Sequence, residues 1–169
     1  MQTQHIEIAK QLGLQPHPEG GYYKEVYRSA GVIPQAVMGS VFSGDRNYST
    51  GIYFMLVGGN FSAFHRIKSD ELWHFYDGDA CTVYVIHLNG EFEAIRLGRD
   101  IANGEVYQAV VPAGAWFASE CVNPTGYSLT GCTVSPGFDF ADFEMAERDN
   151  LINHFPEHAD VITKLTRDV

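Results

Sequence analysis

Short runs of alternating hydrophobic and polar residues, separated by turn residues, recur through residues 50–134. The pattern predicts about eight strands. Their expected ranges are 51–57, 60–67, 71–76, 81–88, 91–97, 106–111, 115–119 and 127–134. A further strand is expected over 22–28, and Asn89-Gly90 is typical of a two-residue hairpin turn. This succession of short strands favours an all-β sandwich or barrel.

The two ends of the chain have helical patterns. Ile6, Ala9 and Leu12 form an apolar stripe, so we expect a short helix over 3–12 that ends at Gly13. Residues 14–21 hold two prolines and two adjacent glycines, which predicts an extended stretch and then a flexible turn. Apolar residues within 139–155 and 161–165 predict C-terminal helices packed outside the β-unit. We expect one domain over 1–169, with its β-core at about 14–138.

Composition narrows the classes of partner. Hydrophobic residues make up 45% of the chain and charged residues 19%, as in a folded globular protein. The net charge of −10, without a basic stripe, argues against nucleic acid. No apolar run approaches the roughly 20 residues needed to span a bilayer. The first residues lack the features of a signal peptide, so no membrane partner and a cytoplasmic location are expected.

The cysteines follow no zinc-binding spacing. Cys81, Cys121 and Cys132 are odd in number, which favours reduced, buried thiols over disulfides. A reactive role for Cys132 is the less favoured alternative, because no base stands near it in the sequence.

One spacing carries most of the chemical information. Gly59-x5-His65-x-Ile67-x3-Glu71-x6-Gly78 resembles the first motif of the cupins, which usually reads G-x5-H-x-H-x3-E-x6-G. Cupins are small β-barrels, and the histidines and the glutamate of this motif commonly bind a metal ion. Ile67 stands where the second of these histidines is usual.

The second cupin motif, G-x5-P-x-G-x2-H-x3-N, is also altered. Pro112 and Gly114 are present, but Phe117 and Cys121 occupy the histidine and asparagine positions. Of the four usual ligands only His65 and Glu71 remain, and a catalytic zinc or iron site needs at least three. We therefore expect no metal cofactor. A metal bound through His65 and Glu71 would need a substitute ligand, such as His74 or His87.

The resemblance extends to one family. Residues 16–23, 69–76, 111–118 and 131–140 are similar to the signatures of the cupin-5 family, a cupin domain of unknown function. The resemblance implies a jelly-roll (double-stranded β-helix) barrel and a homodimer or higher homo-oligomer, without an agreed reaction. The fold is also similar to that of the dTDP-4-dehydrorhamnose epimerases, which bind nucleotide sugars without metal and use a histidine base and a tyrosine acid.

Strand parity predicts where the candidate site lies. His65 and Glu71 are expected to face the barrel interior and to meet across two adjacent antiparallel strands. His65 would act as a general acid or base, and Glu71 would orient it or act as a second acid or base. The alternative is a buried hydrogen-bonded pair with a structural role only. Arg66 and Lys68 have the opposite parity, so they could hold an anionic group only near the barrel mouth.

Several further residues are candidates for substrate binding. His17 and Glu19 either close over a cavity or belong to an arm at a dimer edge. Tyr53 is one of several tyrosines that could serve an epimerase-like site. Trp73 and Phe117 would either form an apolar cavity wall or lie in the core, as aromatic residues more often do. The acidic run Asp139-x2-Asp142-x-Glu144 is expected at a solvated helix N-terminus.

Three functions remain open. The first is a metal-independent isomerase or epimerase acting on a small polar metabolite, such as a sugar or sugar derivative. The second is a small-molecule binding or regulatory module without catalysis. The third is a metal-dependent oxygenase or isomerase with a non-standard ligand set.

Overall fold

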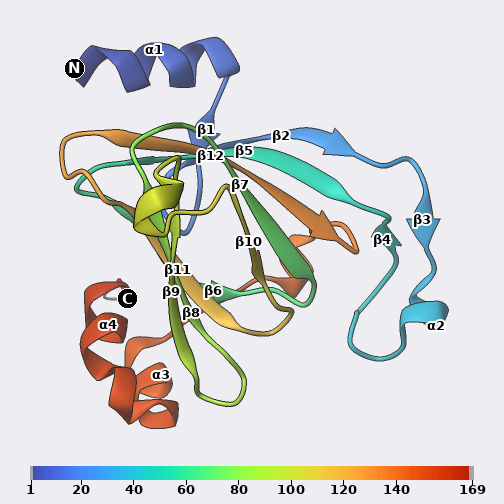
Figure 1. Ribbon diagram of the computed structural model, residues 1–169. Helices are drawn as coiled ribbons and strands as arrows, with labels where there is room; N and C mark the ends of the chain where they lie inside the picture. The colour runs from blue at the N-terminus through green and yellow to red at the C-terminus, as the bar shows by residue number, and fades with distance from the viewer. Residues whose placement is uncertain (1, 168–169) are drawn as a thin grey trace.

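The computed structural model describes residues 2–167, which fold into two facing antiparallel sheets with helices outside them (Figure 1). The larger sheet has the order β1 (Gln15–Pro16), β2 (Tyr22–Arg28), β5 (Thr50–Val57), β12 (Tyr127–Ser135), β7 (Asp70–Gly78) and β10 (Gln108–Val111). The smaller sheet has the order β13 (Glu144–Met145), β6 (Phe61–Arg66), β11 (Trp116–Cys121), β8 (Cys81–Ile86) and β9 (Phe92–Leu97). The predicted jelly roll is confirmed, as a two-sheet sandwich rather than a closed barrel.

The predicted strands are confirmed within a few residues of their expected ends. β10 begins two residues late, at Gln108, because residue 106 instead forms an isolated parallel bridge with Leu97. The turn at Asn89-Gly90 is wider than two residues. The N–H of His87 bonds to the carbonyl of Glu91 at 2.9 Å, and Gly90 takes φ 86°.

A small excursion between β2 and β5 was not predicted. It contains β3 (Val32–Ile33), α2 (Gln35–Met38) and β4 (Arg46–Asn47), and it projects away from the sandwich (Figure 1). β3 and β4 pair only with each other.

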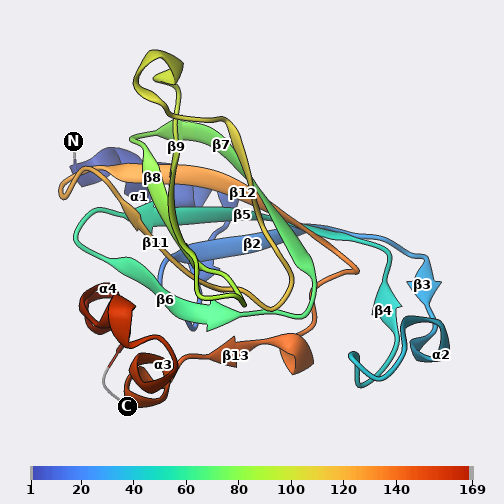
Figure 2. The ribbon, with the colours of Figure 1, turned by 60° about the horizontal axis from the view of Figure 1, so that its bottom comes forward.

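Three helices, α1, α3 and α4, lie on the outer faces of the sheets (Figure 2). α1 (Gln2–Leu12) packs against Met55, Tyr127 and Leu129 of the larger sheet. α3 (Arg148–His154) and α4 (Ala159–Lys164) cover the smaller sheet, where Leu151, Ile162 and Leu165 pack on its outward side chains. Short 3₁₀ turns are η1 (Ile101–Asn103), η2 (Phe140–Asp142) and η3 (Pro156–His158). The expected N-terminal helix and external C-terminal helices are confirmed.

The expected helix over 139–155 is wrong in its first half. Residues 144–145 form β13, which pairs with Arg66 and His65 of β6. The N–H of Ala146 also bonds to the carbonyl of Phe64, at 2.9 Å. These backbone groups are used in a sheet ladder, so α3 begins only at Arg148.

The interior between the sheets is filled by large apolar side chains. Phe54, Trp73, Val83, Val85 and Phe117 are at most 1% exposed and belong to one cluster. No helix within residues 2–167 is long and apolar enough to cross a membrane.

Candidate functional site

A cavity of about 530 Å³ opens into the sandwich beside β6 and β7. Its walls come from β2, β5, β6, β7 and β12, and from the 138–143 segment that follows β12. The buried histidine and glutamate side chains that line it are His17, Glu19, His65 and Glu71. A volume in this range suits a small organic molecule.

His65 lies at the inner end of β6 and has partners at both ring nitrogens. Nδ1 is 2.7 Å from the carbonyl oxygen of Ala63, and Nε2 is 2.9 Å from Oε2 of Glu19. The carbonyl only accepts, so Nδ1 carries a proton. Burial alone would lower the pKa of His65, but the Glu19 carboxylate and the Ala63 carbonyl outweigh it and raise that pKa. His65 is therefore an imidazolium held against Glu19.

Glu19 reaches His65 because two glycines let its loop enter the sandwich. Gly20 has φ 109° and Gly21 φ 79°, values that favour glycine. A Cβ on Gly20 would also collide with the carbonyl of Phe61. The carbonyl of Glu19 accepts the N–H of Ala63 at 2.8 Å, which fixes the loop to β6. Burial would raise the pKa of the Glu19 carboxyl, but the His65 charge lowers it below the usual value.

His17 is a neutral neighbour of this pair. Its Nδ1 lies 3.3 Å from the backbone nitrogen of Glu19 and 3.5 Å from Oε1 of the same residue. One nitrogen cannot accept from the first and donate to the second. Burial lowers the pKa of His17, so we assign Nδ1 as the acceptor of the backbone N–H. The His17 ring also packs edge-on against Tyr23, with centroids 4.6 Å apart.

Glu71 faces the same cavity from β7. Burial raises the pKa of its carboxyl to about 7, the His65 imidazolium opposes that rise, and the Glu19 carboxylate adds to it. Its other polar neighbours, the Cys132 thiol and the Trp73 indole, are neutral. Trp73 Nε1 finds no partner within hydrogen-bonding distance. Glu71 is therefore divided between its protonated and ionised forms near neutral pH.

The expected arrangement of His65 and Glu71 needs correction. Both side chains face the interior, but β6 and β7 belong to different sheets and are not hydrogen-bonded to each other. The two residues approach across the sandwich because the 67–69 connection crosses from one sheet to the other. The partner that orients His65 is Glu19, not Glu71.

Four of the six residues proposed for substrate binding do not line the cavity, and two of them, Tyr53 and Arg66, have their partners elsewhere. Tyr53 of β5 projects to the other face of the larger sheet, where its ring contacts Tyr76 at a centroid distance of 6.0 Å. Arg66 pairs with Glu144 at 2.7 Å and lies over the Trp116 ring at 4.5 Å. It lines a second, separate hollow beside α3. Lys68 was considered as a residue that could bind an anionic group near the barrel mouth, but it does not line the cavity either.

Trp73 and Phe117 lie in the hydrophobic core and not in the cavity wall. Both are 1% exposed, and their rings meet edge to face at 6.4 Å. The Phe117 ring lies 4.0 Å from the His65 ring, centroid to centroid, and so supports it from below.

The segment after β12 supplies lining residues that the sequence pattern does not predict. Phe138, Asp139, Phe140 and Phe143 line the cavity, and the Phe143 ring lies 5.3 Å from that of His65. The apolar spacing that includes Phe140 and Phe143 is the available signal, but it predicts the apolar face of a helix. Two residues of β2, Glu25 and Arg28, also line the cavity and were missed.

The acidic run in this segment is not a solvated helix start. Asp142 is 5% exposed and forms a bidentate ion pair with Arg46 of β4, at 2.6 and 2.7 Å. Asp139 alone has a capping role, since its Oδ1 accepts the N–H of Ala141 at 2.8 Å. The Arg46–Asp142 pair fastens the aromatic segment to the excursion that contains β4.

The residues present do not fit the metal ion that this motif usually binds. Ile67 and Phe117 offer no ligand atom, and both nitrogens of His65 are engaged within the protein. The substitutes considered lie elsewhere: His74 bonds to Thr133 at 3.0 Å, and His87 lies 3.2 Å from Glu93, neither in the cavity. Among residues 2–167, no three His, Cys, Asp or Glu side chains are grouped so as to hold a metal.

A jelly roll with a polar cavity at these motif positions defines a cupin-type protein. The chain belongs to the family described as "Cupin superfamily (DUF985)", which it matches over residues 6–146. It is 30% identical over 154 residues to the uncharacterized protein YML079W of Saccharomyces cerevisiae, covering 85% of this chain and 76% of that protein.

Two solved structures resemble the chain along almost its whole length. Protein SO0799 from Shewanella oneidensis is 39% identical with a TM-score of 0.84, covering 96% of this chain and 97% of that one. A hypothetical protein from Leishmania major is 34% identical with a TM-score of 0.88, covering 96% and 98%. These likenesses establish fold and family, and the names of these proteins describe no activity.

Proposed function

We propose that this protein binds a small polar metabolite, a sugar or sugar derivative, in the cavity and acts on it as a metal-independent isomerase or epimerase. One observation carries the proposal. Glu71, a carboxyl that exchanges its proton near neutral pH, faces a cavity of about 530 Å³ beside the His65 imidazolium. A carboxyl whose pKa is tuned close to the working pH is suited to general acid and base catalysis.

The roles of the two groups follow from their partners. Both nitrogens of His65 are bonded to Ala63 and Glu19, so the group free to exchange a proton with a ligand is Glu71. Ionised Glu71 would remove the proton from a carbon next to a carbonyl and return it to the neighbouring carbon, while the hydroxyl proton passes from one oxygen of the enediolate to the other. The His65 imidazolium would stabilise the negative charge that develops on the enediolate between these steps.

A specific observation also supports a second candidate, a binding module without catalysis. The His65–Glu19 pair is complete within the protein, as a structural pair would be. In that case the cavity would bind its ligand, and Glu71 would make binding depend on pH.

The test begins with a thermal-shift screen of free sugars, polyols and their derivatives against the purified protein. Each compound that binds is then incubated with the protein in D₂O and followed by proton NMR. The proposal expects deuterium to enter the ligand at a carbon-bound position. Glu71→Gln should slow this exchange by about 100-fold or more. Glu93→Gln, on the outer hairpin, is the matched control and should leave it unchanged.

The outcomes separate the candidates. A ligand that binds without exchange points to the binding module, and undiminished exchange in Glu71→Gln overturns the assigned role. Metal analysis of the same preparation addresses the third alternative. Stoichiometric iron, manganese, nickel or zinc would contradict a metal-independent reaction.

A further inference from the structure

The charged groups that line the cavity are mostly acidic. Glu19, Glu25, Glu71 and Asp139 bring carboxyl groups, whereas the lining contains a single arginine, Arg28. The His65 charge is already matched by Glu19 at 2.9 Å. Whether an anion can bind here therefore depends on whether Arg28 is free.

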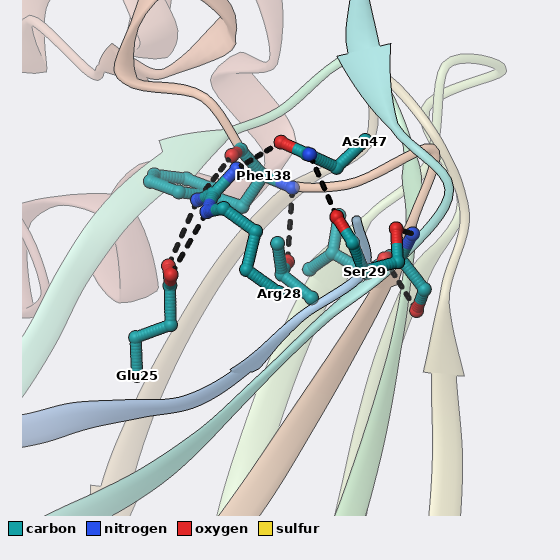
Figure 3. Close-up of polar contacts among 8 residues, drawn as sticks. Glu25, Arg28, Ser29, Asn47 and Phe138 are labelled. Atoms are coloured by element: carbon teal, nitrogen blue, oxygen red, sulfur yellow. Dashed lines mark hydrogen bonds and ion pairs between the residues drawn. The ribbon is translucent and has the colours of Figure 1, made fainter. Parts of the chain in front are cut away.

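Arg28 is occupied by the protein itself (Figure 3). Its Nε and Nη2 atoms each donate to one carboxylate oxygen of Glu25, both at 2.8 Å. Nη1 donates to Oδ1 of Asn47 at 2.8 Å, and Nη2 also donates to the carbonyl of Phe138 at 3.0 Å. A guanidinium has five N–H donors, and the hydrogen bonds just described use four of those of Arg28. The Nε and Nη2 groups, which could bind a phosphate or carboxylate through two parallel hydrogen bonds, already donate to Glu25.

The geometry of β2 places Glu25 where it can pair with Arg28. It stands three residues before Arg28 on β2, which shifts register against β5 between Glu25 and residue 27. The shift allows both side chains to reach the cavity mouth, where each is 38% exposed. An incoming anion would have to displace the Glu25 carboxylate and then lie near it and Asp139, with like charges opposed.

Resting on the proposed function, we infer that the cavity takes an uncharged polyhydroxy ligand and rejects phosphorylated or carboxylated ones, and that Glu25 determines this specificity by occupying Arg28. The uncharged ligand inferred for this cavity differs from the nucleotide sugars bound by the epimerases that share this type of fold. It assigns Glu25 a role in selection and no part in the chemistry.

The test measures binding of inorganic phosphate and glucose 6-phosphate by ³¹P NMR and calorimetry, with glucose as the uncharged comparison. The wild type should bind neither phosphate at millimolar concentration. Glu25→Gln frees the guanidinium, and both phosphates should then bind at least about 10-fold more tightly than to the wild type.

Glu144→Gln is the matched control. It frees Arg66, which is also paired with a partly exposed glutamate but lies outside the cavity. This variant should not gain phosphate binding. An equal gain would show that any released surface arginine suffices, and it would overturn the assignment to the cavity.

The other outcomes are equally decisive. Phosphate binding to the wild type contradicts exclusion of anions. No gain in Glu25→Gln, with the fold intact by circular dichroism, contradicts the role of Glu25. Because the assay measures binding of an added phosphate and no turnover, a failure of the isomerase proposal would leave its result unaffected.

Discussion

Nε2 of His65 lies 2.9 Å from Oε2 of Glu19, which joins β6 to a loop near the N-terminus in the interior of the sandwich. The side chains are 4% and 8% exposed, so water screens the pair little. The contact also uses the histidine nitrogen that a metal ion would require. The first histidine of the cupin motif is thus retained here, but its partner is a carboxylate of the same chain.

Removing the charge of Glu19 should destabilise the fold. Glu19→Gln leaves the His65 imidazolium buried without its counter-charge, which we expect to lower the free energy of unfolding by about 3 kcal/mol. Urea denaturation at pH 6 measures the change. The folded pKa is raised for His65 and lowered for Glu19, so the contribution of the pair is complete between the unfolded pKa of glutamate and that of histidine.

The control for this prediction is Glu144→Gln, which breaks the partly exposed pair with Arg66. It should cost less than about 1 kcal/mol. An equal loss of unfolding free energy in the two variants would mean that the buried His65–Glu19 pair stabilises the fold no more than a partly exposed pair does.

Stability should also fall as the pH rises from about 5 to about 8, because of Glu71. Its folded pKa of about 7 lies above the unfolded value, so the folded state binds a proton that the unfolded state has released. This contribution is complete below the unfolded pKa and is lost as the pH rises through about 7. The loss between pH 5 and pH 8 should be about 2 kcal/mol.

Glu71→Gln isolates that dependence. Its unfolding free energy should exceed that of the wild type by only about 1 kcal/mol at pH 5 and by about 3 kcal/mol at pH 8. The remaining slope would belong to His65, whose raised pKa acts in the same direction. Parallel pH profiles for wild type and variant would remove Glu71 from the explanation.

The thiols should be unreactive in the folded protein. Cys81, Cys121 and Cys132 are buried, and burial raises the pKa of each thiol; the Glu71 carboxylate raises that of Cys132 further. A disulfide reagent at pH 8 should label none of them until denaturant is added. Rapid labelling of Cys132 in the native state would instead support the reactive role considered from the sequence.

The sequence allowed the inward positions of His65 and Glu71 to be predicted, because strand parity is a local property that the motif spacing also fixes. It could not identify Glu19 as the partner of His65. That contact depends on how the loop with Gly20 and Gly21 crosses β6, and no local pattern encodes it. The proximity of His65 and Glu71 was expected for the wrong reason, since adjacent strands in sequence proved to lie in different sheets.

In the 139–147 segment, the local pattern predicts the wrong conformation. Its apolar spacing is compatible with a helix, but β6 has an open edge, and pairing with that edge decides the conformation of Glu144 and Met145. Asp142 was expected in solvent because it was assigned to the N-terminus of that helix. Its partner Arg46 lies in an excursion that the strand pattern did not reveal.

The pKa of the Glu71 carboxyl is the most direct test of the site described here. Carbon-13 NMR of protein labelled at its glutamate side chains follows each carboxyl through a pH titration, and the signal missing in Glu71→Gln assigns the resonance. We expect Glu71 to titrate at about 7 in the wild type. Its pKa should be higher still in His65→Gln, because the nearby positive charge is lost. A midpoint near the ordinary glutamate value in the folded wild type would contradict the account.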